Sequence, residues 1–193
     1  MGLLDKFSRA FLQEREGDFI KLEDSADDDD SNIRLVRPAV LLYNFPAGIL
    51  DEELVDILED GAPQASKKGV ALQRIPDMND PLLEMSLEEA LQTVMNDNGK
   101  SPNNSSPTIA STMAPTVNNP GNPVLIFSGF SNKELMASYR TIAEEIFMEN
   151  GGRAACAKAV PNALSKPLRQ VVEEISGDHD NALKMEETPT EKQ

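Results

Sequence analysis

The residues best placed to do chemistry form a short turn, Ser128-Gly129-Phe130-Ser131-Asn132-Lys133, between an apolar run and a helical pattern. A glycine here lets the backbone approach a ligand, and the first N–H groups of a helix can bind an anion. Lys133 adds a positive charge beside them. Gly129, Ser131, Asn132 and Lys133 are therefore the candidate site for a phosphate or another anionic ligand.

The same turn also has a purely structural explanation. Ser131 suits the N-cap of a helix, and Glu134 three residues later completes a capping box. Gly129 would relieve a tight turn. The glycine patterns of phosphate-binding loops and dinucleotide sites are absent from the sequence. We therefore favour the structural interpretation and keep anion binding as the alternative.

Other reactive residue types are scarce. Cys156 lies among alanines, which predicts a buried and inert thiol, and His179 falls in a polar C-terminal stretch. The carboxylate pairs Glu144-Glu145 and Glu173-Glu174 would point about 100° apart on a helix, so neither forms a paired acid and base. One cysteine and one histidine provide no zinc spacing. We predict no catalytic constellation, no metal site and no cofactor.

Composition excludes several functional classes. The chain has 193 residues and a formal charge of −15, which disfavours binding to nucleic acid. Its single cysteine cannot form an intramolecular disulfide, which fits the cytoplasm or another reducing compartment such as an organelle stroma. The start does not resemble a secretory signal. No apolar stretch reaches the ~18–20 residues of a membrane span.

The N-terminal residues 1–36 read as an amphipathic helix followed by an acidic, disordered spacer that contains Asp27-Asp28-Asp29-Asp30. Helical spacing over residues 3–15 predicts one apolar face, which is made of Leu3, Leu4, Phe7, Phe11 and Leu12. That face would pack on the body of the protein, bind a partner protein, or lie on a membrane surface. The mixed charge of the helix makes the membrane surface the third choice.

The rest of the chain repeats itself. Pro38 opens an apolar run and is followed 38 residues later by Pro76, and Pro123 and Pro161 repeat the pattern at the same interval. Each repeat reads strand–helix–strand–helix, with helices starting at the caps Asp51 and Ser86 in the first and Ser131 and Ser165 in the second.

We therefore predict an α/β fold of two degenerate repeats, residues 37–94 and 122–176, which form a small, mainly parallel sheet covered by helices. A polar stretch over 95–121 is expected to be a flexible linker, and 177–193 a disordered tail. Whether all four strands share one sheet is left open by the length of the linker.

The second repeat also resembles a known family. The segments Val124 to Ser131, Glu134-Leu135 and Ala157 to Asn162 are similar to a family of small α/β domains of unknown function. The resemblance covers about fifty residues, and it implies a fold but no activity. In the first repeat, Asn44-Phe45-Pro46 replaces the Gly-Phe-Ser of that family.

These features favour a non-catalytic protein-interaction or assembly module that recruits a protein partner through its N-terminal helix. One alternative is a domain that senses or processes an anionic ligand at the Gly129 turn. A second alternative is an adaptor on a membrane surface. The sequence does not indicate the oligomeric state.

Overall fold

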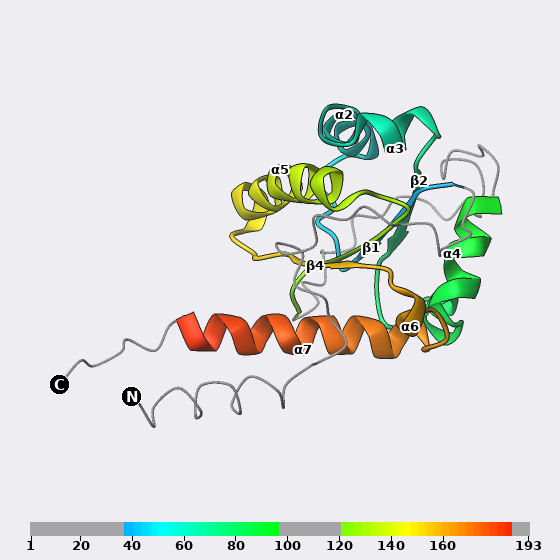
Figure 1. Cartoon of the computed structure of the whole chain (residues 1–193). Coiled ribbons are helices and arrows are strands. Elements are labelled where there is room, and N and C mark those ends of the chain that lie inside the picture. Colours follow the sequence, from blue (N-terminus) through cyan, green and yellow to red (C-terminus); the bar gives the residue numbers. More distant parts are fainter. Residues whose placement is uncertain (1–36, 97–120, 187–193) are drawn as a thin grey trace, which may run out of the picture.

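The computed structural model describes residues 37–96 and 121–186, which form one four-stranded sheet between two layers of helices (Figure 1). The elements in chain order are β1 (Ala39–Tyr43), α2 (Asp51–Gly61), α3 (Pro63–Lys67), β2 (Ala71–Ile75), the 3-10 helix η1 (Pro81–Glu84), α4 (Leu87–Asn96), β3 (Val124–Ser128), α5 (Asn132–Asn150), β4 (Ala155–Lys158), α6 (Pro161–Leu164) and α7 (Leu168–Glu186). The strand order is β2-β1-β3-β4.

The sheet is built from two like units. β1 pairs with β2 in parallel, and β3 pairs with β4 in parallel. An antiparallel pair between β1 and β3 joins them, with Leu41 opposite Ile126. The predicted α/β fold and the mainly parallel sheet are therefore confirmed, and all four strands share one sheet.

Equivalent backbone bonds show that the two units match in register. The carbonyl of Pro38 accepts from Ala71 N at 2.9 Å, and the carbonyl of Pro123 accepts from Ala155 N at 2.7 Å. The prolines that open the two sequence repeats thus occupy the same place in each unit.

A second contact follows the same approximate two-fold symmetry on one face of the sheet. Leu87 N donates to Lys166 O at 2.9 Å, and Leu168 N donates to Met85 O at 2.8 Å. These reciprocal bonds join the chain segments that lead into α4 and α7. The units are therefore tied together both within the sheet and above it.

The two central strands are buried along their whole length, as their continuous apolar sequences predict. Alternate residues point to opposite faces, which produces two separate cores. One core lies under α4 and α7 and includes Leu41, Leu87, Leu91 and Val172. The other lies under α2 and α5 and includes Leu42, Leu58, Phe127 and Ile142.

The helices α2 and α5 meet at a point where only small residues fit. A Cβ placed on Gly61 would come within 2.7 Å of Ser138 Oγ and 2.9 Å of Ser138 N. The glycine that ends α2 therefore has a packing role besides its expected role in ending the helix.

Two of the predicted helix starts were wrong. Asp51 is the first residue of α2 and Leu50 holds the cap position, because the Asp51 carboxylate is engaged by Arg74 instead. Ser165 follows the short helix α6, and α7 begins only at Leu168. The capping boxes at Ser86 and Ser131 are confirmed.

The boundary predicted at Gly177 was also wrong, because α7 continues through it to Glu186. Asn122 Nδ2 donates to Asp180 Oδ1 at 2.6 Å, which ties this part of the helix to the chain just before β3. The good helix formers Ala182, Leu183 and Lys184 extend the helix beyond its apolar stripe.

Several predictions fall outside the described residues. They concern the helix over 3–15, the acidic spacer, the linker between 97 and 120, and the last seven residues. Within the described ranges, no helix combines the length and the apolar character needed to cross a membrane.

Candidate functional site

The turn that the sequence singles out lies between the end of β3 and the start of α5. Gly129 has a φ of 76°, which is the left-handed region that glycine favours. A Cβ on Gly129 would lie 3.2 Å from Pro38 Cα. Both its dihedral angle and its close approach to the start of β1 therefore explain the glycine without a ligand.

The hydroxyl of Ser131 is committed to its own helix. Ser131 Oγ accepts from Glu134 N at 3.3 Å and donates to Glu134 Oε2 at 3.0 Å. The other oxygen of that carboxylate, Glu134 Oε1, accepts from Gln64 N at 2.7 Å and from Ala65 N at 3.3 Å. Glu134 thus satisfies N–H groups at the start of α3, and a carboxylate already stands beside the predicted anion site.

Asn132 is held by a lysine from the neighbouring strand. Lys158 Nζ donates to Asn132 Oδ1 at 3.1 Å. Lys133 is exposed. The structure therefore brings Ser131 and Asn132 into contacts with Glu134 and Lys158, and Lys133 points its charge to solvent at the same end of α5.

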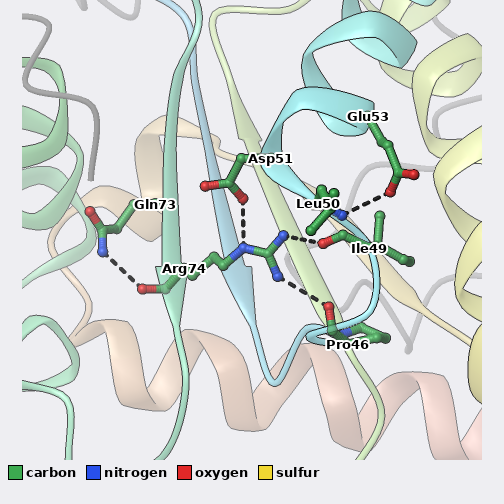
Figure 2. Close-up of polar contacts among 7 residues, drawn as sticks. All are labelled: Pro46, Ile49, Leu50, Asp51, Glu53, Gln73 and Arg74. Atoms are coloured by element: carbon green, nitrogen blue, oxygen red, sulfur yellow. Dashed lines mark hydrogen bonds and ion pairs between the residues drawn. The ribbon is translucent and has the colours of Figure 1, made fainter. Parts of the chain in front are cut away.

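The equivalent position in the first unit holds a larger polar network, which Figure 2 shows. Arg74 Nε donates to Asp51 Oδ1 at 2.7 Å, its Nη1 donates to Pro46 O at 3.1 Å, and its Nη2 donates to Ile49 O at 2.5 Å. The guanidinium also lies 5.1 Å from the ring centroid of Phe45.

Register shows that Arg74 and Lys158 are counterparts. Arg74 lies opposite Leu42 in β1, and Lys158 lies opposite Phe127 in β3. Each cation contacts the first residue of the helix that follows the central strand, Asp51 in one unit and Asn132 in the other. Sequence reasoning missed Arg74, although a lone cation near the end of a predicted strand was a usable signal.

A further network that the sequence did not indicate links α7 to the end of β2. Arg169 Nη2 donates to Met78 O at 2.9 Å and is also bonded to Glu84 Oε1. Burial, followed by the charge of Asp77, raises the pKa of the nearby Tyr43 hydroxyl. These contacts of Arg169 hold the segment around η1 against α7.

Cys156 is partly buried, not fully buried as its sequence context predicts, and it packs against the core under α2 and α5. Burial raises the pKa of the Cys156 thiol to about 12, so it is a poor nucleophile at neutral pH. Tyr139 beside it donates from its hydroxyl to Ala154 O at 2.7 Å, and burial raises its pKa as well. His179, predicted to lie solvated in a tail, is instead half-buried on α7.

Two further observations concern ligand chemistry. The buried hydroxyl of Ser128 has no hydrogen-bond partner among the described residues, but alternation along β3 directs it to the α7 face, away from the turn before α5. Over 37–96 and 121–186, no group of three His, Cys, Asp or Glu side chains is placed to hold a metal ion.

Comparison with known proteins adds one finding. Residues 123–181 match the model of a family described as a domain of unknown function (DUF3783), which covers less than half of the chain. The match confirms the resemblance of the second unit to an uncharacterised family. No curated protein and no solved structure matches the chain.

Proposed function

We propose that the protein is a non-catalytic interaction or assembly module, which recruits a protein partner through the apolar face of its N-terminal helix. The observation that carries this proposal is a set of large apolar side chains left exposed on the α2 and α5 side. Leu50 is 55% exposed, Phe147 is 56% exposed and Met148 is 76% exposed. Exposed apolar side chains of this kind often mark a protein-binding surface, because a partner that covers them removes apolar area from water.

Two of these side chains flank one contact. A Cβ on Gly48 would come within 2.0 Å of Glu149 Oε1, so the loop before α2 lies against the end of α5. Leu50 follows this glycine by two residues, and Met148 precedes the glutamate. This corner supports a surface that works alongside the N-terminal helix.

The polar groups at the carboxyl ends of the parallel strands also support a non-catalytic role. Arg74 is bonded to a carboxylate and to loop carbonyls, and Lys158 contacts Asn132. Such contacts hold loops in place, and a catalytic site would instead aim convergent polar groups at a substrate.

The test compares two sets of substitutions in the full chain. Leu4→Ser with Phe7→Ser and Phe11→Ser removes the apolar face of the N-terminal helix, and Lys6→Ser with Arg9→Ser is the matched change on its polar face. Quantitative affinity purification with mass spectrometry should lose the specific partner in the first variant only. Retention of every partner in both variants would refute recruitment by this helix.

The anion-binding alternative rests on the left-handed Gly129 turn and the exposed Lys133 at the start of a long helix. Thermal melting with inorganic phosphate and a panel of nucleotides tests it. A stabilising shift that is lost in Lys133→Ala would favour this alternative over the interaction module. The membrane-surface alternative is tested by flotation of the full chain with anionic vesicles.

A further inference from the structure

Exposed apolar side chains gather on one side of the sheet. Of the large apolar side chains that stay exposed in the described part of the chain, Leu50, Val55, Phe147 and Met148 belong to α2, to α5 or to the turn before α2. Figure 1 shows these two helices next to each other on the same side of the sheet. On the α4 and α7 side, only Met185 among the described residues is exposed in this way.

The start of α2 lies beside the end of α5, where a Cβ on Gly48 would come within 2.0 Å of Glu149 Oε1. Three of the exposed apolar side chains flank this contact, and we call them the corner patch: Leu50, Phe147 and Met148. A partner that covers the corner patch would remove apolar area of both helices from water.

Carboxylates surround the corner patch. Glu52-Glu53 follow Leu50 in the first turn of α2, and Glu144-Glu145 precede Met148 by one turn of α5. All four glutamates are exposed. Each end of the corner patch therefore carries negative charge at its border.

The cations of this region do not offset the carboxylates. Residues 44–53 and 140–153 hold six carboxylates and two cations, which are Arg140 and Arg153. Arg74 reaches the same loop but is paired with Asp51. The rest of α2 adds three carboxylates and no cation. The lysines of this side, Lys67, Lys68 and Lys133, lie at the opposite end of the two helices.

This negative charge decides which occupant fits the corner patch. Residues 1–36 carry ten carboxylates and five cations, residues 97–120 one of each, and residues 187–193 two carboxylates and one cation, so none of these segments of the chain is basic. A second copy would bring two acidic patches together. Nucleic acids and anionic lipids would be repelled as well. A basic segment of another protein is the occupant that charge favours.

The backbone around the corner patch is already bonded. Leu50 N donates to Glu53 Oε2 at 2.8 Å, as Figure 2 shows, and Leu50 O accepts from Leu54 N at 3.2 Å. Phe147 O accepts from Gly151 N at 2.8 Å. The partner therefore contacts side chains here, which suits a helix because its own backbone groups are paired internally.

We propose that the corner patch binds a basic amphipathic helix of a partner protein. Apolar side chains of that helix cover Leu50 and Met148, and its lysines or arginines contact the surrounding glutamates. The proposal rests on the interaction function proposed above and adds the chemistry of a partner.

The experiment uses the isotope-labelled full chain and a synthetic peptide of about four helical turns, with leucine along one face and lysine on the other. We expect the peptide to shift the methyl resonance of Met148 and to leave that of Met185, a similarly exposed methionine on α7, unchanged. Raising the salt concentration should weaken the effect. A peptide with glutamate in place of lysine should not bind.

One matched pair of variants tests the apolar contact. Met148→Gln should weaken binding of the lysine peptide about tenfold, and Met185→Gln should leave it unchanged. The proposal is overturned if the Met148 methyl does not respond, if the glutamate peptide binds as well as the lysine peptide, or if the two variants behave alike.

A second matched pair tests the charges. Glu144→Gln with Glu145→Gln should weaken binding about fivefold, whereas Glu173→Gln with Asp178→Asn, an equal change of charge on α7, should not. Equal effects of the two double variants would show general attraction to an acidic protein and would overturn the proposal.

The triple serine variant of the N-terminal helix separates this proposal from recruitment by that helix. It should bind the lysine peptide as the wild type does. Partners retained in that variant together with normal peptide binding would refute the recruiting helix and leave the corner patch standing. Loss of peptide binding in the triple serine variant would place the peptide on the N-terminal helix and overturn the proposal.

Discussion

The first and second units place a cation at the same position of their outer strands and use it differently. In the first unit seven residues (44–50) connect β1 to α2, whereas in the second only three (129–131) connect β3 to α5. Arg74 holds the longer loop at two carbonyls and one carboxylate, and Lys158 makes a contact with the neutral Asn132. A planar guanidinium with several donors suits the longer loop better than an ammonium does.

The residues that follow the central strands show a second contrast. Asn44 and Gly129 are equivalent and both have positive φ, at 50° and 76°. Only Gly129 also approaches another backbone closely, at Pro38. Both turns thus require a residue with left-handed dihedral angles. Only the turn at Gly129 also requires a residue without a side chain.

The largest expected effect comes from removing Arg74. Arg74→Met should lower the free energy of unfolding by about 2–4 kcal/mol, because an ion pair and two bonds to loop carbonyls are lost. Lys158→Met should cost only about 1 kcal/mol. Urea unfolding of both variants measures the difference. An equal loss of unfolding free energy in the two variants would show that the two cations stabilise their units equally.

Next in size is the effect of a side chain at Gly129. Gly129→Ala should destabilise by about 1–3 kcal/mol, since alanine meets both the positive φ and the contact with Pro38. Gly129→Asn copies the first unit and separates these causes, because asparagine tolerates the dihedral angle but not the contact. If Gly129→Asn is as stable as the wild type, the close approach to Pro38 has no energetic weight.

A smaller effect is expected at the two capping boxes, one at Ser86 before α4 in the first unit and one at Ser131 before α5 in the second. Ser86→Ala should cost about 1 kcal/mol, and Ser131→Ala should cost more because Glu134 also bonds to α3. The backbone N–H of Ser86, followed by its hydroxyl, holds the pKa of Glu89 below its ordinary value of 4.5. The ionised carboxylate therefore adds stability above that pH, and this stability is lost as the pH falls through the lowered pKa.

The Ser86→Ala variant tests that sign directly. Its deficit relative to the wild type should shrink as the pH of the urea titration falls below 4.5. A deficit that grows toward acid pH would contradict the assigned role of the Ser86 hydroxyl.

The smallest expected effect at neutral pH concerns the thiol, whose counterpart in β2 is Leu72. Cys156 should react with a thiol reagent far more slowly in the native chain than in urea, since its pKa is raised to about 12. Because the unfolded thiol ionises near 9.0, stability should fall as the pH rises from that value toward 12. Rapid native reaction at neutral pH would show that β4 does not bury the sulfur.

Local sequence signals predicted much of this fold. Pro38 and Pro123 marked the same place in the two units, although Pro76 and Pro161 lie one residue out of register because Arg74 is the counterpart of Lys158. The capping boxes at Ser86 and Ser131 each lie within four residues of sequence, so no tertiary knowledge was needed. The start at Asp51 was wrong because a partner 23 residues away takes its carboxylate. A local rule cannot anticipate such competition.

The candidate site was less predictable for the same reason. The bonds from Gln64 and Ala65 to Glu134 join residues 70 and 69 positions apart, and the sequence carries no pattern that would reveal them. That Gln73 and Ala157 lie on the two outer strands becomes visible only after the strand order is known. The recruiting role of Leu3, Leu4, Phe7, Phe11 and Leu12 stays a prediction.

The central claim is that two like units join through an antiparallel pair of β1 and β3, and nuclear Overhauser contacts test it most directly. In the full chain we expect close Hα–Hα contacts between Val40 and Phe127 and between Leu42 and Leu125. Contacts in a parallel register, or none between these strands, would contradict the account.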